Sequence, residues 1–345
     1  ISRNYDTSEI YGIHNNQKLT NIFKDDNDHK KASLILLESI NNNENICILG
    51  DYDVDGACAT SLLVRYFKHI NQKNFYYIPN RTVDGYGASK KLFQKLILKN
   101  PKLVIMVDCG SNSIDAVDFL RQNNIKSIII DHHEMNKPYP KSNVIINPKK
   151  NTDYGEYDYL CSTTLTYFFI DMVILKMKSK FKLSDFLIYV LLATVCDVMP
   201  LRKLNKILSS NVLRNFKLEN NLAFKTIFDE LSLKKKLTVE DLGFLIGPII
   251  NSGGRLGYSN YGAELLTSNN KDTLQKKTSE LINLNNKRKK LEKNILNEIN
   301  FTKISRKNKN VIIYHDNNMH EGLIGIIAAR LKEYFNKPSI VLTKS

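Results

Sequence analysis

The sequence lacks the usual features of membrane, secreted and zinc-binding proteins. No run of about 18 consecutive apolar residues occurs, which argues against a transmembrane helix. No secretory signal is visible, because Arg3, Asp6 and Glu9 interrupt the first apolar residues. The five cysteines form no CxxC pair, and three of them lie in apolar runs, so we expect reduced core thiols. These absences predict a cytoplasmic protein with no membrane partner.

Negative charge is scarce relative to positive charge. The 50 Lys and Arg residues outnumber the 35 Asp and Glu residues and give a net charge of +15. Such an excess suits a polyanionic partner such as nucleic acid. An AT-rich genome also enriches Lys, Asn and Ile, so charge alone does not settle the function.

Strand-like and helical stretches alternate through the first half of the chain. Helices are expected at residues 32–40, 57–70, 89–98 and 114–122. The expected strands are Ile46–Leu49, Phe75–Ile78, Leu103–Val107, Ser127–Ile130 and Val144–Ile146. This alternation predicts an α/β fold: a Rossmann-like parallel sheet with a helical part.

Composition divides the chain into four segments. Residues 160–201 are apolar and helical in pattern, residues 247–257 are glycine-rich, and a long charged helix is expected over residues 272–300. A lysine-dense stretch then precedes a new strand at residue 311. The expected segments are an N-terminal extension and helix at 1–45, a main domain at 46–270, a connecting helix and linker at 271–308, and a second α/β domain that begins at 309–345 and is incomplete at Ser345.

Aspartate and histidine residues follow three of the predicted strands. They are Asp51, Asp53 and Asp55 after the first strand, Asp108 after the third, and Asp131, His132 and His133 after the fourth. Ligands bind beyond the carboxyl ends of parallel strands, and a cation would offset the repulsion among these carboxylates. Carboxylates with imidazoles suit Mn²⁺ or Mg²⁺. Two such ions about 3.5 to 4 Å apart commonly activate water against phosphate esters.

Plainer interpretations of these residues exist. The DxDxDG stretch is not an EF-hand calcium loop, because Leu62 stands where that loop needs Glu. Asp108 could simply cap a helix, and histidine pairs are often structural or exposed. Asp197 lies in an apolar segment, where an unpaired carboxylate is costly, although it could also be a polar helix end before Pro200. The joint occurrence of all four features favours the metal site.

The first acidic stretch has an alternating pattern. In an extended strand end, Asp51, Asp53 and Asp55 would share one face. Gly56 would then let the chain turn tightly into the next helix.

Seven motifs together resemble a known family. GDYDVDG, VDCGS, DHH and ATVCDVMPL, in this order, resemble the motifs of the DHH phosphoesterase superfamily. YIPNRTVDGYG at 77–87, INSGGRLG at 250–257 and HEGLIGIIAARL at 320–331 narrow the resemblance to the bacterial RecJ branch, the single-strand-specific DNA exonucleases. The resemblance implies that 46–270 is a DHH phosphoesterase domain and that 309–345 begins a truncated DHHA1 domain.

The resemblance also implies roles for individual residues. His133 would act at the scissile phosphate, and Asp55 or Asp108 would bridge two metal ions. The implied metal ligands are Asp51, Asp53, Asp55, Asp108, His132 and Asp197. The implied substrate-binding residues are Arg81, Asn251, Arg255, His320 and Gly322. For Arg81, a surface ion pair is the plain alternative.

The implied activity is hydrolysis of single-stranded DNA with two Mn²⁺ or Mg²⁺ ions, from the 5′ end and with release of 5′-mononucleotides. Single-strand-binding protein and a helicase are candidate protein partners. Another DHH enzyme, such as an oligoribonuclease, a cyclic dinucleotide phosphodiesterase or a pyrophosphatase, is one alternative; a non-catalytic DNA-binding relative is the other. The first motif begins with Gly50 and Asp51 rather than the His of those other enzymes, and every metal-ligand position is filled.

One stretch departs from the family pattern. LCSTTLTYFF at 160–169 stands where the family usually has a glycine-rich run. Ser162, Thr163 and Thr164 add side chains where backbones approach closely, so a shift of this helix is expected.

Overall fold

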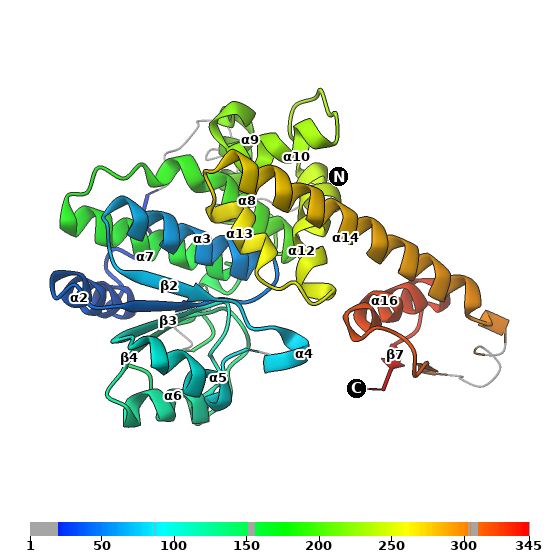
Figure 1. Ribbon diagram of the computed structural model, residues 1–345, viewed down its shortest axis with the longest axis horizontal. Helices are drawn as coiled ribbons and strands as arrows, with labels where there is room; N and C mark the ends of the chain where they lie inside the picture. Colours follow the sequence, from blue (N-terminus) through cyan, green and yellow to red (C-terminus); the bar gives the residue numbers. More distant parts are fainter. Residues whose placement is uncertain (1–19, 86, 151–155, 303, 305–309, 345) are drawn as a thin grey trace.

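A five-stranded parallel sheet forms the centre of the larger part of the molecule (Figure 1). The computed structural model describes residues 20–85, 87–150, 156–302, 304 and 310–344. The strands are β1 (Ile46–Leu49), β2 (Asn74–Tyr77), β3 (Leu103–Val107), β4 (Lys126–Ile130) and β5 (Val144–Ile146). Their order is β2-β1-β3-β4-β5, with every neighbouring pair parallel. The predicted α/β class is confirmed.

Helices cover both faces of this sheet, as Figure 1 shows. Ile46 and Ile48 point into the larger core, and Cys47 and Leu49 point into a second core on the other face. This alternation follows from the two-residue period of a strand. The larger core is covered by α2 (Asn27–Asn41), α3 (Val54–His69) and α7 (Ser162–Met177), and the second by α5 (Lys90–Leu96) and α6 (Ile114–Gln122).

The first helix begins earlier than the sequence predicts. The sequence predicts a helix from residue 32, but α2 begins at Asn27. Asp26 caps it, because the Asp26 side chain accepts a hydrogen bond from the backbone N–H of His29 at 2.8 Å. His29 is buried and stacks on Phe23, so this turn is fixed by packing as well as by the cap.

A group of helices packs beside α3 and α7. They are η3 (Leu183–Phe186), α8 (Leu187–Cys196), α9 (Lys203–Asn215), η4 (Leu218–Asn220), α10 (Leu222–Glu230), α11 (Val239–Asp241), η5 (Leu242–Ile246), α12 (Gly247–Arg255) and α13 (Tyr261–Thr267). The glycine-rich stretch is therefore mostly helical, which its composition did not indicate. A Cβ at Gly247 would lie 2.3 Å from the Cys196 sulfur, so this glycine permits close helix packing.

The helix α14 (Lys271–Glu298) leads from this group to a small second sheet (Figure 1). Strands β6 (Ile312–His315) and β7 (Ser339–Leu342) pair in parallel. Helix α16 (Ile324–Phe335) packs on them, with η6 (Glu321–Leu323) before it. Ile312, Ile327 and Leu331 belong to a hydrophobic cluster separate from the two cores of the main sheet.

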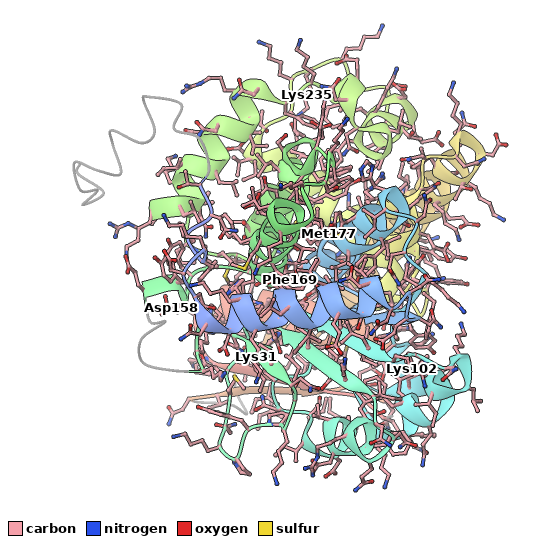
Figure 2. All side chains as sticks on the ribbon, turned by 90° about the vertical axis from the view of Figure 1, so that its left-hand side faces the viewer. Lys31, Lys102, Asp158, Phe169, Met177 and Lys235 are labelled. Atoms are coloured by element: carbon pink, nitrogen blue, oxygen red, sulfur yellow. The ribbon has the colours of Figure 1, made fainter. Side chains whose placement is uncertain are left out.

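Exposed lysines lie on widely separated parts of the surface. Lys31, Lys102 and Lys235, which Figure 2 labels, belong to α2, the approach to β3 and the loop after α10. Phe169 is buried in the larger core. All five cysteines are free thiols and four are buried, as expected. Among the described residues, no helix is both long and apolar enough to cross a membrane.

Candidate metal centre

The acidic and histidine residues converge where the strand order reverses. β1 lies beside both β2 and β3, and such a switch point opens a crevice beyond the carboxyl ends of the strands. Three overlapping groups of side chains there have ligand atoms within 4.8 Å of one another. They are Asp51, Asp53 and Asp108; Asp55, His132 and Asp197; and Asp108, His132 and His133. All of the predicted metal-binding and catalytic residues therefore lie together at this edge of the sheet.

The first three aspartates do not share a strand face, so that expectation is wrong. β1 ends at Leu49, and Asp53 caps α3 by accepting a hydrogen bond from the Gly56 N–H at 3.0 Å. Asp55 lies in the first turn of α3. The alternation of carboxylates therefore spans a loop and a helix start, where negative side chains are favoured by the helix dipole.

Gly56 does not make a tight turn either. It lies within α3, and an added Cβ would be 2.6 Å from the backbone nitrogen of Asp51. Real Cβ atoms do not approach so closely, so only glycine lets α3 lie against the Asp51 backbone. This contact holds the loop of Asp51 and Asp53 over the start of α3.

The start of α7 anchors Asp55. The two Asp55 carboxylate oxygens accept hydrogen bonds from the backbone N–H groups of Ser162 at 2.7 Å and Thr163 at 2.8 Å. The helix dipole of α7 adds to this attraction. The Thr163 hydroxyl also donates to the Asp55 carbonyl oxygen at 2.9 Å. Two of the side chains that depart from the family pattern, those of Ser162 and Thr163, thus bond to the site.

Asp108 is the most constrained carboxylate. Its backbone has φ +60°, in the left-handed region that Asp tolerates better than most residues, and it is 1% exposed. The Ser162 hydroxyl donates to Asp108 Oδ1 at 3.0 Å, whereas Oδ2 has no hydrogen-bond partner. Burial and the charges of Asp55 and Asp53 raise the Asp108 pKa well above its usual range.

Asp131 orients His133, a role that was not predicted from the sequence. Asp131 Oδ1 accepts from His133 Nδ1 at 2.7 Å and from the His132 N–H at 2.8 Å, and Oδ2 accepts from the Ser111 N–H at 3.1 Å. The bond to Asp131 raises the His133 pKa to about 9. Burial alone would raise the Asp131 pKa, but the bonds from His133 and Ser111 outweigh it and bring the pKa to about 2. Asp131 is the first residue of the DHH motif, so its place beside His133 was visible in the sequence.

Two further carboxylates of the cluster, those of Asp51 and Asp197, hold protons more tightly than usual. Burial, followed by the charge of Asp53, raises the Asp51 pKa to about 8. Burial, followed by the charges of Asp55 and Asp53, raises the Asp197 pKa to about 7. The positively charged groups of the protein therefore do not fully offset the negative charge at this edge of the sheet.

Several polar atoms of the cluster are buried without a hydrogen bond. They include Asp51 Oδ1, Asp108 Oδ2, Asp197 Oδ2 and both ring nitrogens of His132. His132 Nε2 lies 3.2 Å from Asp197 Oδ2, 3.5 Å from Asp108 Oδ1 and 3.7 Å from Asp55 Oδ2. Burial lowers the His132 pKa, which favours the neutral ring that can bind a metal. This set of oxygen donors and one imidazole fits Mn²⁺ or Mg²⁺.

Comparison with known proteins agrees with this arrangement. Residues 45–194 match the DHH family, N-terminal domain. The chain contains a DHH family domain. It is 28% identical over 331 residues to the single-stranded-DNA-specific exonuclease RecJ of Haemophilus influenzae, covering 91% of this chain and 58% of that protein. It is 31% identical over 332 residues to RecJ of Salmonella typhimurium, covering 89% and 56%. The chain thus spans a little over half the length of these relatives.

Solved RecJ structures have the same fold. RecJ in complex with Mn²⁺ from Thermus thermophilus superposes with a TM-score of 0.80 at 22% identity, over 92% of this chain and 46% of that one. An exonuclease RecJ bound to manganese gives a TM-score of 0.82 at 23% identity, over 95% and 81%. A Mg²⁺ complex of the Thermus thermophilus protein also matches, with a TM-score of 0.70. The chain is RecJ-like in fold.

Asn251, Arg255, His320 and Gly322, which resemble RecJ substrate-binding residues, are not members of the three carboxylate and histidine groups. Asn251 and Arg255 line a pocket of about 370 Å³. Arg255 Nη1 donates to the Gly322 carbonyl at 3.3 Å, and the Gly322 N–H donates to His320 Nδ1 at 3.1 Å. Arg81 begins the short helix α4 (Arg81–Asp84), and its side chain lies outside the described part of the structure. Gly254 packs against the ring of Tyr52, because a Cβ there would be 2.4 Å from that ring. Tyr52 stands between Asp51 and Asp53, so this contact places α12 beside the metal centre.

Proposed function

We propose that this chain is a metal-dependent exonuclease acting on single-stranded DNA. It would work from the 5′ end and release 5′-mononucleotides, in DNA repair and recombination. The observation that carries the proposal is the convergence of five carboxylates and two histidines at one sheet edge with buried, unpartnered donor atoms. The similarity to the single-stranded-DNA-specific exonuclease RecJ supports the choice of substrate.

The two metal ions would be held by the overlapping groups. We assign Asp51, Asp53 and Asp108 to one ion and Asp55, His132 and Asp197 to the other, with Asp108 or Asp55 as the bridging carboxylate. Bound Mn²⁺ or Mg²⁺ would lower the pKa of a bound water and neutralise phosphate oxygens. The Ser162 hydroxyl and the first amides of α7 hold the ligand carboxylates Asp108 and Asp55 in place.

His133 is suited to the scissile phosphate. Its raised pKa keeps it protonated at neutral pH, and its side chain is 45% exposed, so a substrate can reach it. Asp131 holds Nδ1 and leaves Nε2 to donate a hydrogen bond or a proton to a phosphate oxygen. Arg81, Asn251, Arg255, His320 and Gly322 remain our candidates for contacts with the rest of the strand.

The same proposal includes the domain organisation. Residues 46–270 would form the DHH phosphoesterase domain after an N-terminal extension and helix at 1–45. Residues 271–308 would connect it to the beginning of a DHHA1 domain at 309–345. The separate hydrophobic cluster around Ile312 and Leu331 supports this division. Single-strand-binding protein and a helicase remain candidate partners.

Digestion of end-labelled single-stranded DNA tests the activity. With Mn²⁺, a 5′ label should appear first in a mononucleotide, whereas a 3′ label should stay on shortening strands. Asp108→Ala should lower the rate by about a thousandfold or more, because it removes a ligand shared by two of the groups. Asp115→Asn, at an exposed carboxylate on α6, should cleave normally.

Two results would exclude the proposal. Cleavage of dinucleotides but not of strands longer than about ten nucleotides would indicate an oligoribonuclease-like enzyme. Strands of that length fall within the range of about 4 to 16 nucleotides that one oligonucleotide-binding fold spans. Metal-independent binding of DNA without cleavage would indicate a non-catalytic relative.

A further inference from the structure

Helix α8 ends beside the metal centre in a backbone arrangement that at least five other helices of the chain share. The Val198 N–H donates a hydrogen bond to the Val195 carbonyl at 3.2 Å, and the Met199 N–H donates one to the Thr194 carbonyl at 3.0 Å. This pair of bonds is the Schellman motif, which closes a helix with one residue in the left-handed conformation. At the end of α8 that residue is Val198, with φ +55°.

Valine is an unfavourable residue for this position. The same pair of hydrogen bonds ends α2, α3, α6, α7 and α10, where the left-handed residues are Asn43, Asn71, Asn124, Lys178 and Ser232. Glycine and asparagine tolerate this conformation best, whereas a branched Cβ crowds the backbone. Among the non-glycine residues with positive φ in the part of the chain that the structure describes, Val198 is the single β-branched one.

Packing within the protein does not explain the valine. The Val198 side chain is 85% exposed, so burial does not offset its unfavourable backbone conformation. The other helices show that a polar residue closes the same motif. Residues in strained backbone conformations cluster at functional sites, where the side chain has a use that outweighs the strain. An apolar side chain here gains most from a contact with a bound molecule.

Val198 directly follows the proposed metal ligand Asp197, so their Cα atoms are about 3.8 Å apart. Asp197 Oδ2 lies 3.2 Å from His132 Nε2, and the Asp197 side chain is 27% exposed. Val198 therefore lies at the solvent-facing rim of the metal centre. A phosphodiester held at that centre is bonded through its oxygens to sugar carbons on both sides. The apolar part of the substrate nearest to the metal ligands is thus the C–H face of a sugar, because the bases lie further from the phosphate.

We propose that Val198 is a substrate-contacting residue whose side chain packs on the sugar next to the scissile phosphate. The inference rests on the proposed function. The two hydrogen bonds of the Schellman motif fix the Val198 backbone, and a β-branched side chain has few rotamers. The contact surface is therefore held in place before the substrate binds, and such pre-organised contacts lose little conformational entropy on binding.

Val198→Gly and Val198→Asn test the contact, because both new residues suit the left-handed conformation. Each variant should melt at or above the melting temperature of the unmutated chain, since the strained valine is gone. Each should nevertheless lower kcat/KM on single-stranded DNA by about tenfold, the lower end of what one methylene contact is worth. The loss should come from a higher KM, because a contact made equally in the bound substrate and the transition state leaves kcat unchanged.

Titration calorimetry with Mn²⁺ separates a direct contact from a displacement of Asp197. Both variants should bind Mn²⁺ like the unmutated chain. Lys178→Gly is the matched control, because it makes the same backbone change in the Schellman motif of α7. Lys178 lies about 24 Å along that helix from the end at the metal centre. The control should melt at or above the unmutated chain and should keep its kcat/KM.

A strand with abasic sugars distinguishes the sugar from the base. The probe is an oligothymidylate whose first two nucleotides at the 5′ end lack their bases, so that the sugars on both sides of the scissile phosphate remain. The tenfold difference between the unmutated chain and Val198→Gly should persist on this strand.

The outcomes separate this inference from the proposed function. The sugar contact is wrong if Val198→Gly keeps its kcat/KM, if it binds Mn²⁺ more weakly, or if its loss disappears on the abasic strand. None of these results affects the nuclease activity of the unmutated chain. Failure of the unmutated chain to release mononucleotides from 5′-labelled DNA would overturn the proposed function, and this inference with it.

Discussion

Asp108 combines two features that are unfavourable in a protein without a bound cation. It is a buried carboxylate among other carboxylates, and its backbone is in the left-handed region. A φ of this kind costs of order 1 kcal/mol or more in a non-glycine residue. Such strain persists at functional sites, and a divalent ion would convert the local repulsion into affinity.

The raised pKa values predict how stability depends on pH when metal is removed. In the unfolded chain, aspartates are deprotonated above about pH 4 and histidines above about 6.5. In the folded protein, Asp197, Asp51 and His133 keep their protons up to about 7, 8 and 9. The folded state thus binds more protons, so its stability should fall as the pH rises from about 4 to about 9. The two aspartates lose their contributions between about pH 4 and 8, and His133 loses its contribution between about pH 6.5 and 9. Urea unfolding in chelator measures this dependence.

The Asp51→Asn variant serves as the comparison, because Asn does not titrate. Its stability should decline less steeply over the same range. An unchanged slope would show that Asp51 is not held protonated by the cluster.

Ser162 offers a test of ligand positioning. Ser162→Ala removes the hydroxyl that donates to Asp108 Oδ1 but keeps the backbone N–H that bonds Asp55. Loss of such an outer partner typically lowers metal affinity by about tenfold or more. Mn²⁺ titration calorimetry should show this loss, whereas Thr164→Ala, two positions further along α7 with its hydroxyl near Cys161, should bind Mn²⁺ normally.

The residues of the metal centre could be predicted because they follow strand ends, and strand ends meet at one edge. The groups that hold these residues in position by hydrogen bonds could not be predicted. Ser162 lies 107 positions from Asp55, and nothing in the local sequence around either residue indicates that they are bonded. Asp131 was visible in the DHH motif, but its hydrogen bonds to His133 and Ser111 depend on how two loops pack.

At the scale of the elements, close approaches define the site. Helix α3 lies against the Asp51 loop at Gly56, and α12 lies against Tyr52 at Gly254. The five strands of the main sheet could be predicted to within a residue because buried parallel strands are short apolar runs. The strand β7 was not predicted. The helical course of residues 247–255 could not be predicted, because glycines in a helix oppose its formation. Close packing against Cys196, Tyr258 and Tyr52 explains the three glycines of this helix.

Glycine substitutions test these close approaches. Gly56→Ala should destabilise the protein by about 1–3 kcal/mol and weaken Mn²⁺ binding, because the new methyl group clashes with the Asp51 backbone. Gly325→Ala is the control: it lies in α16 with no atom within 4 Å of an added Cβ. There, alanine should stabilise the helix by about 0.5–1 kcal/mol. Equal effects in chemical unfolding would contradict this view of Gly56.

At the scale of the whole molecule, two hydrophobic units are joined by α14. The pocket lined by Arg255, Arg288, Lys289 and Arg330 lies where they meet. The net charge of +15 is spread over the surface, as the positions of Lys31, Lys102 and Lys235 show (Figure 2). Total charge therefore does not locate the site. The clustering of charges does locate it. Cations without carboxylates line the pocket, and carboxylates lie together at the sheet edge beside it.

Metal binding should also stabilise the whole larger unit. A ligand that binds only the folded state at about one hundred times its dissociation constant adds about 2.7 kcal/mol. Mn²⁺ should therefore raise the melting temperature, and chelator should reverse the shift. The Asp108→Asn variant should melt higher than the unmutated chain in chelator but gain little from Mn²⁺. A similar rise in melting temperature with Mn²⁺ in the variant would show that Mn²⁺ binds away from Asp108.

Anomalous diffraction at the manganese edge, on crystals grown with Mn²⁺, tests the central claim most directly. We expect two peaks, one bounded by Asp51, Asp53 and Asp108 and the other by Asp55, His132 and Asp197. No peak among these side chains, or peaks only at surface carboxylates, would contradict the two-metal centre.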